Sequence, residues 1–503
     1  MSVRIVATDN VLFNDNKKKR PVMKKFYDYI IVGSGASGGA LSYFLSRSGA
    51  KVLMLEAGKR YAADTFSSNE MHANSRLMWG GGTEMNTEAD QIFLRGKVVG
   101  GGTIINQCLL DRFDDVAYND WRTQSGVGFH DLSTMNRHYD EVESHLSLYT
   151  MQKQDWNGNA ELYAKAFDNL GLEHSPLRRG QSNCNNDNDC IVCLGGCSRK
   201  SKQSTLETFI PKAEKEGLTL ISEFEVAEVI HGESFVTVQG NHKGEATTYY
   251  GRKCIIASGA VGTTKLLLKS QLQKKLPALG KNFHCHPQWM TLAFFNDTVD
   301  SHKGFFQTLK SSDPRFRQWG FKLENVFAGP IALALLKQGY GGDHQQFMQR
   351  LRNMACIEVA VRDQDPGEIS LNNAGKVVIK KPLSDGDRQR ANHGNRLVND
   401  MFNSLGAYEV MTSPMRIGLH LMGGCTIGQN AATSVVNEGF EVHGMKNIYI
   451  ADSSTFPNAP GVNPMLTILA LAHRASETIL AEAGQRTTAS RTTQKTASKE
   501  KTS

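Results

Sequence analysis

The residues most able to do chemistry begin near the N-terminus, where three glycines and a carboxylate stand at fixed spacing. Gly33, Gly35 and Gly38 form a G-x-G-x-x-G run between an apolar, β-prone segment and a segment of helical period. The first glycine permits a tight turn, the second lets the backbone approach a pyrophosphate, and the third lets the helix pack on the strand. Glu56 ends the next apolar segment, where a carboxylate can bind ribose hydroxyls. An ordinary glycine turn would not need a strand before it, a helix after it and a carboxylate at the end of the next strand. The pattern therefore predicts a bound dinucleotide, either FAD or NAD.

Three later segments carry further patterns. Residues 96–106 read GKVVGGGTIIN, in which consecutive glycines allow the backbone to lie flat against a cofactor. A C-terminal block holds His-x-x-Gly-Gly at 420–424, an apolar strand that ends at Asp452, and Gly-Val-Asn-Pro at 461–464. In order and spacing these segments resemble the glucose–methanol–choline (GMC) oxidoreductases, and the 96–106 segment is similar to the family's first signature at every position. A segment from Gly259 matches the second signature in part.

The resemblance covers about residues 26–483. The His-x-x-Gly-Gly and Gly-Val-Asn-Pro motifs are most similar to those of cholesterol oxidases and long-chain alcohol oxidases. Motifs at 280–287 and 358–363 support that branch, whereas Thr264 and Gln271 depart from the second signature. The resemblance implies that the chain binds FAD without a covalent link and oxidises a small-molecule alcohol by hydride transfer to flavin N5. An NAD-dependent enzyme would have no use for the later segments. A flavin-binding protein without turnover is a further alternative.

His420 and Asn463 are the candidate catalytic residues. Removing the hydroxyl proton of an alcohol needs a base with a pKa near neutrality, and histidine supplies one. His420 is interpreted as part of a glycine-rich loop, and the resemblance makes it the base. Asn463 precedes Pro464, a pair favoured at a helix N-terminus, so a plain cap is the alternative interpretation. The resemblance implies that Asn463 faces the substrate hydroxyl, while its helix points a positive end at the flavin.

Apart from Val226, the residues predicted to bind the cofactor come from the segments described above. They are Gly33, Gly35, Gly38, Glu56, Gly101, Gly102, Thr103, Asn106, Val226, Asp452 and Asn463. The alcohol itself stays open between a sugar, a fatty alcohol and a sterol. A group of aromatic residues in the second half of the chain could either line an apolar substrate pocket or belong to an ordinary core. These are Phe305, Phe306, Phe316, Trp319, Phe321 and Phe327.

Four of the nine cysteines crowd into one polar, Asn/Asp-rich segment. Cys184, Cys190, Cys193 and Cys197 could hold an iron–sulfur cluster or zinc, or could be metal-free thiols or a local disulfide. The run resembles a cysteine-rich segment of long-chain alcohol oxidases and also the iron–sulfur loop of bacterial FAD-dependent sugar dehydrogenases. A cluster would pass electrons to a cytochrome or quinone, and its absence would leave oxygen or a soluble acceptor.

The elements that position these residues predict an α/β protein. Apolar strands are expected at 27–32, 51–55, 253–257 and 448–452, with helices at 36–48 and 464–482, which gives a Rossmann-like FAD domain on a parallel sheet. We expect this domain to be discontinuous, with an inserted α+β substrate domain on a mostly antiparallel sheet. The expected bounds are 26–150, 205–275 and 416–483 for the FAD domain, and 151–204 and 276–415 for the substrate domain, which includes the cysteine-rich loop.

Charge and hydropathy exclude some classes of function. The net charge of +7 is concentrated in two basic, aperiodic tails, 1–25 and 484–503, which we expect to be disordered. Nucleic-acid binding by the folded body therefore has no support. No apolar run reaches the ~20 residues of a membrane span, and no secretory signal is recognisable. These features predict a cytoplasmic protein and leave a peripheral contact with a membrane surface open.

Overall fold

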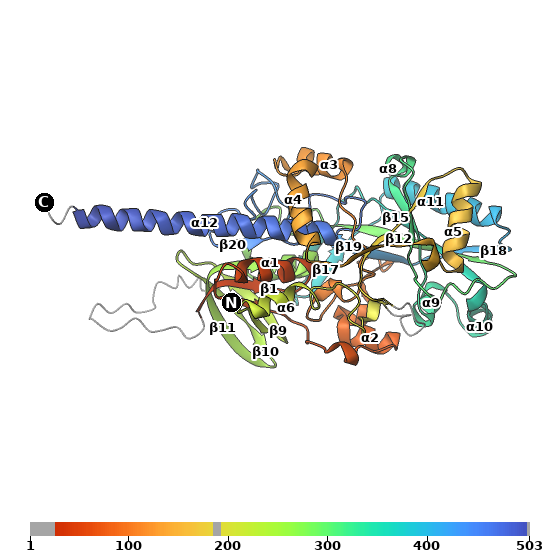
Figure 1. The fold of residues 1–503 in the computed structure, drawn as a ribbon, viewed down its shortest axis with the longest axis horizontal. Coiled ribbons are helices and arrows are strands. Elements are labelled where there is room, and N and C mark those ends of the chain that lie inside the picture. Colours follow the sequence, from red (N-terminus) through yellow and green to blue (C-terminus); the bar gives the residue numbers. More distant parts are fainter. Residues whose placement is uncertain (1–25, 185–192, 500–503) are drawn as a thin grey trace.

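The computed structural model describes residues 26–184 and 193–499, with side chains as far as Gly484 (Figure 1). The N-terminal extension predicted for 1–25 lies outside these residues, as does the part of the cysteine-rich segment that contains Cys190. The described residues form two large sheets. No helix in this part of the chain is both long and apolar enough to cross a membrane.

The first sheet has seven strands and a parallel centre. β1 (Phe26–Val32) pairs in parallel with β2 (Val52–Leu55) on one side and with the end of β11 (Glu245–Ile256) on the other. The outer strands are β8 (Thr219–Ile221), β9 (Phe224–Ile230), β10 (Val236–His242) and β20 (Ile448–Ile450). The order is β8-β2-β1-β11-β10-β9, and β20 also pairs with β11 in parallel. Each parallel strand predicted from the sequence is therefore present, and the Rossmann-like class is confirmed.

Helices cover this sheet and complete its core. α1 (Ala36–Ser46) follows β1 and contacts both α6 (Phe209–Lys215) and α12 (Met465–Lys499), and α12 also contacts α4 (Leu132–Glu143). The apolar side chains of β1 and of these helices belong to one buried cluster. The chain thus places the first turn of α1 and the start of α12 beside the ends of the central strands.

α12 continues beyond the end that the sequence predicts. It runs as one helix from Met465 to Lys499 and projects from the body of the protein (Figure 1). The prediction of a disordered tail from residue 484 is therefore wrong for 484–499. This segment has no proline to end the helix, so the helical backbone of α12 continues along it.

The second sheet has nine strands and is mostly antiparallel, as predicted. Its order is β3-β4-β19-β12-β15-β14-β13-β6, and β18 pairs with β12. The strands are β3 (Glu84–Met85), β4 (Gln91–Phe93), β6 (His174–Pro176), β12 (His284–Phe294), β13 (Leu309–Ser311), β14 (Phe321–Asn325), β15 (Met354–Val361), β18 (Glu409–Thr412) and β19 (Arg416–Met422). All residues of β12 and β15 are buried, so both faces of the sheet centre are covered.

Two apolar clusters lie on opposite faces of this sheet. Trp289 and Ala293 of β12 pack with α5 (Gly158–Asn169) and α11 (Asp385–Ser404), whereas Met290 and Leu292 pack with α9 (Pro330–Leu336) and α10 (Gly341–Gln349). The alternation follows from the period of two along a strand. The remaining helices are α2 (Glu70–Leu77), α3 (Asp115–Ser125), α7 (Gly259–Lys269) and α8 (Arg315–Trp319). Two small two-stranded antiparallel sheets pair β5 (Leu148–Thr150) with β7 (Arg178–Gly180) and β16 (Glu368–Leu371) with β17 (Val377–Lys380).

The sheet membership differs from the predicted domain bounds at two places. β3 and β4 belong to the second sheet, although the sequence predicted 26–150 to belong to the FAD domain. β19 also belongs to the second sheet, although 416–483 was likewise assigned to the FAD domain. Strands of two and three residues are too short to show a period. β19 is placed by its pairing with β12, more than 130 residues earlier in the chain, which no local pattern reveals.

Candidate active site

The first glycine run forms the strand-to-helix turn for which its spacing is suited. Gly33 has a φ of +101°, and α1 begins directly after Gly35. A Cβ on Gly38 would lie 2.0 Å from the carbonyl oxygen of Gly33, so only glycine allows this approach of helix and strand. A Cβ on Gly35 would meet no atom within 4 Å, which leaves open space where the predicted pyrophosphate needs it.

Glu56 is held at the end of β2 by the same turn. Its Oε2 accepts hydrogen bonds from Ser34 N at 3.0 Å and Ser34 Oγ at 2.7 Å, and its Oε1 accepts one from Gly58 N at 2.7 Å. The carboxylate is therefore fixed where the predicted ribose would bind. Its remaining acceptor positions are the ones available to ribose hydroxyls.

The second glycine segment packs directly against the first. Gly101 has a φ of +51°, and a Cβ on it would lie 2.9 Å from the Cα of Gly35. Thr103 closes this turn by donating from Oγ1 to the carbonyl oxygen of Gly100 at 2.6 Å. Asn106 accepts from Cys108 N at 3.1 Å, which fixes its side chain at the same edge. The two segments together form one wall of a cavity.

Asp452 ties the C-terminal block to the first sheet. Its Oδ2 accepts hydrogen bonds from Gly259 N at 2.7 Å and Thr263 Oγ1 at 2.6 Å, at the start of α7. Its Oδ1 accepts from the backbone and the hydroxyl of Ser454. A buried carboxylate with four donors is fully satisfied, so Asp452 positions this turn against the cavity.

One cavity of about 590 Å³ unites the predicted site residues. It is lined by Gly33, Gly35, Glu56, Gly101, Gly102, Thr103, Asn106, Val226, Asp452, His420 and Asn463. Gly38 packs behind it and supports the turn. Gly102, like Gly35, has no atom within 4 Å of the place of a Cβ. This cradle of bare backbone, with Glu56 at its far side, fits a flavin dinucleotide.

His420 lies on β19 and not in a loop, which corrects the interpretation from sequence. Its φ of +56° is left-handed, and the register between β12 and β19 shifts beside it. Its Nδ1 lies 2.9 Å from Nδ1 of His286 on β12, and Nε2 of His286 accepts a hydrogen bond from Gly461 N at 3.1 Å. The irregular strand therefore turns the His420 ring toward His286 and the cavity.

These contacts define the tautomers of both rings. The backbone N–H of Gly461 can only donate, so a neutral His286 carries its proton on Nδ1 and donates it to Nδ1 of His420. His420 then carries its own proton on Nε2. Burial and then the positive charge of Lys322 lower the pKa of His420 to about 3, and burial and then His420 lower the pKa of His286 well below its ordinary value. Both rings are therefore neutral at neutral pH.

Asn463 lies just ahead of α12 and is held by a cation. Met465 is the first residue of α12, and the carbonyl oxygen of Pro464 accepts the first helical bond, from Ile468 N at 2.9 Å. Pro464 therefore occupies the cap position, and Asn463 lies one residue before it. Its Oδ1 accepts a hydrogen bond from Lys322 Nζ. With its oxygen engaged, the amide presents Nδ2 as a donor.

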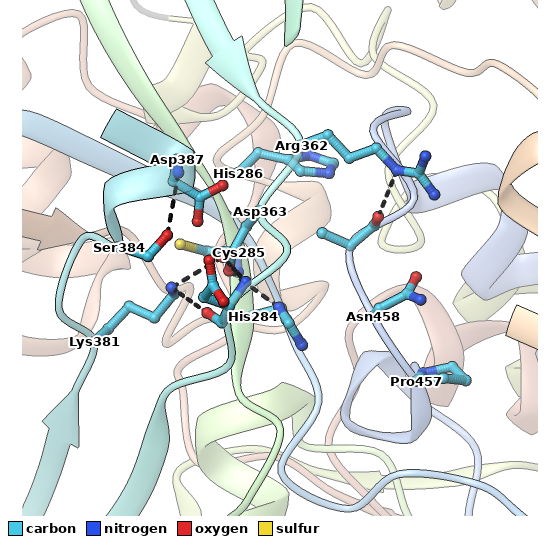
Figure 2. A network of polar contacts seen from close by, with 12 residues as sticks. His284, Cys285, His286, Arg362, Asp363, Lys381, Ser384, Asp387, Pro457 and Asn458 are labelled. Carbon is cyan, nitrogen blue, oxygen red and sulfur yellow. Dashed lines mark hydrogen bonds and ion pairs between the residues drawn. The ribbon is translucent and has the colours of Figure 1, made fainter. Parts of the chain in front are cut away.

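A buried ionic network supports the strand that carries His286 (Figure 2). Asp363 lies between His284, at 3.1 Å from its Nδ1, and Lys381, whose Nζ donates at 3.0 Å. Burial alone would raise the pKa of Asp363, but His284 and then Lys381 hold it below its ordinary value. Arg362, the residue before Asp363, donates from Nε to the carbonyl oxygen of Ala459 at 3.1 Å. The network fixes β12 against the loop that contains Gly461.

The described part of the cysteine-rich segment lies beside the cavity. Lys202 Nζ donates to the carbonyl oxygens of Cys193 at 2.7 Å and Asn106 at 3.0 Å, which ties this segment to the second glycine segment. Cys193 Sγ lies 3.7 Å from Nη2 of Arg179, and Cys184 packs against a small apolar cluster. Because the predicted ligand Cys190 is outside the described residues, the iron–sulfur interpretation stays a prediction.

Sequence reasoning missed two residues of the site, His286 and Lys322. His286 belongs to the 280–287 motif, which carried a family resemblance but no role, and Lys322 has no local signal at all. The aromatic residues whose place was left open do not line the cavity, at least among the described residues. Phe306, Phe316, Phe321 and Phe327 pack in the apolar clusters of the second sheet.

Comparisons with known proteins agree with this geometry. The sequence models of the GMC oxidoreductase N-terminal and C-terminal regions match residues 74–288 and 363–472, and that of an NAD(P)-binding Rossmann-like domain matches residues 31–90. A long-chain-alcohol oxidase of Arabidopsis thaliana is 25% identical over 90% of this chain and 67% of its own length. A cholesterol oxidase of Acinetobacter baumannii is 22% identical over 91% of this chain and 95% of its own length.

Solved structures of the same fold cover nearly the whole chain. Pyridoxine 4-oxidase from Mesorbium loti superposes with a TM-score of 0.73 at 13% identity, over 90% of this chain and 98% of that one. An FAD-dependent oxidoreductase from Chaetomium thermophilum gives 0.67 at 15% identity, over 91% and 99%. With the family regions matched across both sheets, the chain belongs to the GMC oxidoreductase family and is an FAD-dependent oxidoreductase.

Proposed function

We propose that this oxidoreductase oxidises an alcohol to an aldehyde or ketone in the cavity that His420 and Asn463 both line. The observation that carries the proposal is this pair itself. A histidine from the second sheet and an asparagine from the start of α12 line one cavity with the dinucleotide cradle. Bound FAD would supply the hydride acceptor. The relatives named as long-chain-alcohol and cholesterol oxidases support the same reaction class.

Each of the two residues has a separate task at the substrate hydroxyl. Asn463 donates from Nδ2 to the oxygen, because Lys322 occupies its Oδ1. His420 accepts the hydroxyl proton at Nε2, which requires its ring proton to sit on Nδ1. In the resting tautomer both residues donate, an arrangement that suits the product carbonyl. Reaching the base-competent tautomer costs the Gly461 hydrogen bond to His286, about 1–3 kcal/mol.

We propose oxygen as the electron acceptor, on the names of the related oxidases. An iron–sulfur cluster at Cys184, Cys190, Cys193 and Cys197 would instead favour a dehydrogenase that reduces a cytochrome or quinone, and iron and sulfide analysis separates the two. A cytoplasmic location and a peripheral membrane contact stay predictions from the sequence.

The pair is tested with His420→Ala and Asn463→Ala in the FAD-loaded protein. Both variants should keep the flavin spectrum, and His420→Ala should lower the rate of anaerobic flavin reduction by about 10²–10⁴-fold, the usual contribution of a general base. A wild-type rate in His420→Ala would remove it from the chemistry.

A further inference from the structure

Beyond His420 and Asn463, four polar side chains form one part of the cavity wall, which we call the polar wall. It consists of Gln288, Gln307, Glu324 and Glu358, each of which is at most 7% exposed to solvent. They come from β12, β14, β15 and the segment before β13. Gln288, Glu324 and Glu358 lie on the same face of the second sheet as the apolar cluster that packs against α9 and α10. Apolar side chains occupy the continuation of this face, so the polar stretch is confined to the cavity.

Hydrogen bonds join this polar wall to the proposed reaction centre. Lys322 Nζ contacts both Asn463 Oδ1 and Glu324 Oε1. Glu324 stands directly opposite Glu358 in the β14–β15 register, and Gln307 Nε2 donates to Glu324 Oε2 at 2.9 Å. One ammonium group therefore separates the hydroxyl partner Asn463 from the carboxyl pair. The wall lies where the rest of a substrate must lie once its hydroxyl is at Asn463.

Part of this wall lacks a protein partner. Oε1 of Gln288 accepts no hydrogen bond from any residue that the structure describes, although the side chain is 2% exposed. Gln288 lies on β12 two residues after His286, so it is close to the reaction centre. Covering an unpaired buried amide with hydrocarbon costs free energy, because the amide then has no hydrogen-bond partner. A ligand with hydroxyl groups supplies that partner.

The charges of the wall nearly cancel. Lys322 is paired with Glu324, and Lys310 Nζ is paired with Asp111 Oδ2 at 2.7 Å nearby. Burial and then the neighbouring Glu324 raise the pKa of Glu358 well above its ordinary value, which favours the uncharged form of this carboxyl group. A cationic or anionic substrate would find no opposite charge left for it.

We infer that the substrate is a small, uncharged alcohol with several hydroxyl groups, of the polyol or sugar class, and not a fatty alcohol or sterol. The inference rests on the proposed alcohol oxidation and narrows it. A long alkyl chain or a sterol ring would cover the two amides and the carboxyl pair with hydrocarbon. The aromatic residues that could have formed an apolar pocket pack in the core instead.

The test compares alcohols of equal chain length with the FAD-loaded protein. Anaerobic flavin bleaching is followed with glycerol against propan-1-ol and with hexitols and neutral hexoses against hexan-1-ol, and dodecan-1-ol is added in detergent. At least one polyol or hexose should exceed its alkanol by about 100-fold or more in kcat/KM, because a site built for hydroxyl groups rejects analogues that lack them. Faster bleaching by hexan-1-ol or dodecan-1-ol would overturn the inference and leave alcohol oxidation standing. If no alcohol bleaches the bound flavin, the proposed function fails and the inference falls with it.

Matched variants connect the selectivity to the wall. Gln288→Leu and Gln307→Leu should each lower kcat/KM for the preferred polyol by about tenfold or more, and should raise it for hexan-1-ol. The control, Gln273→Leu, changes an exposed glutamine outside the cavity and should leave both values unchanged. An unaltered flavin spectrum shows that each variant is folded. Equal losses for both alcohols would contradict a role in selectivity.

Discussion

Gly35 offers a test in which folding and cofactor binding separate. Its φ of −62° is compatible with alanine, and a Cβ there meets no protein atom within 4 Å, yet the residue lines the cavity. Gly35→Ala should therefore leave the free energy of unfolding of the FAD-free protein unchanged or raise it by about 0.4–1 kcal/mol. The added methyl group instead occupies space that the pyrophosphate needs. Overpacking of about 1–3 kcal/mol corresponds to FAD binding that is about 5- to 150-fold weaker.

The assay titrates FAD-free protein with FAD by flavin fluorescence, alongside urea unfolding without FAD. Gly128→Ala is the control, because it is an exposed glycine outside the cavity whose Cβ would lie 3.5 Å from the nearest neighbour, Glu438 Oε1. Gly38→Ala is the contrast, because its Cβ would collide with Gly33 and should destabilise the protein even without FAD. Wild-type FAD affinity in Gly35→Ala would refute the placement of the phosphates at this turn.

Three further predictions concern buried groups. Burial and then Asp363 raise the pKa of Asp387 from 3.8 to about 6, so the folded protein keeps a proton that the unfolded chain loses between these values. The contribution of Asp387 to the free energy of unfolding should thus fall by about 2 kcal/mol as pH rises from about 4 to 6, and Asp387→Asn should abolish this contribution in urea unfolding at both pH values. Asp452→Asn replaces an acceptor oxygen by an NH₂ group that faces hydrogen-bond donors, so it should lower the free energy of unfolding by about 2–4 kcal/mol. A wild-type midpoint in urea unfolding would contradict the four-donor site. His286→Asp should move the ring proton of His420 from Nε2 to Nδ1 and raise the pKa of His420. The measurement is ¹⁵N NMR of labelled histidines in both proteins. An unprotonated Nε2 on His420 of the wild-type protein would refute this tautomer assignment.

The sequence sufficed for features that are local. The G-x-G-x-x-G turn, Glu56 at the end of β2 and the first parallel strands are each set by neighbours within about thirty residues, and all are present as predicted. The glycines predicted to bind the cofactor stand out in the sequence because glycine is needed wherever a backbone must approach a ligand or another backbone closely. Gly38 illustrates this, since any side chain would meet Gly33.

Features that depend on distant pairing could not be read from the sequence. The irregular register of β12 with β19 brings His286 to His420, 134 residues away, and Lys322 reaches Asn463 across 141 residues. The edge strands β3 and β4 have two and three residues, too few to show a period. The residues after 483 were interpreted as disordered because they are polar, basic and without period, whereas α12 runs through them to Lys499.

The central claim is tested most directly by purifying the protein anaerobically, recording its visible spectrum and adding the alcohol panel. An oxidised-flavin spectrum that bleaches with an alcohol and returns on exposure to oxygen is the predicted result. A protein that takes up no FAD, or a bound flavin that no alcohol reduces, would contradict the assignment of alcohol oxidation to the cavity of His420 and Asn463.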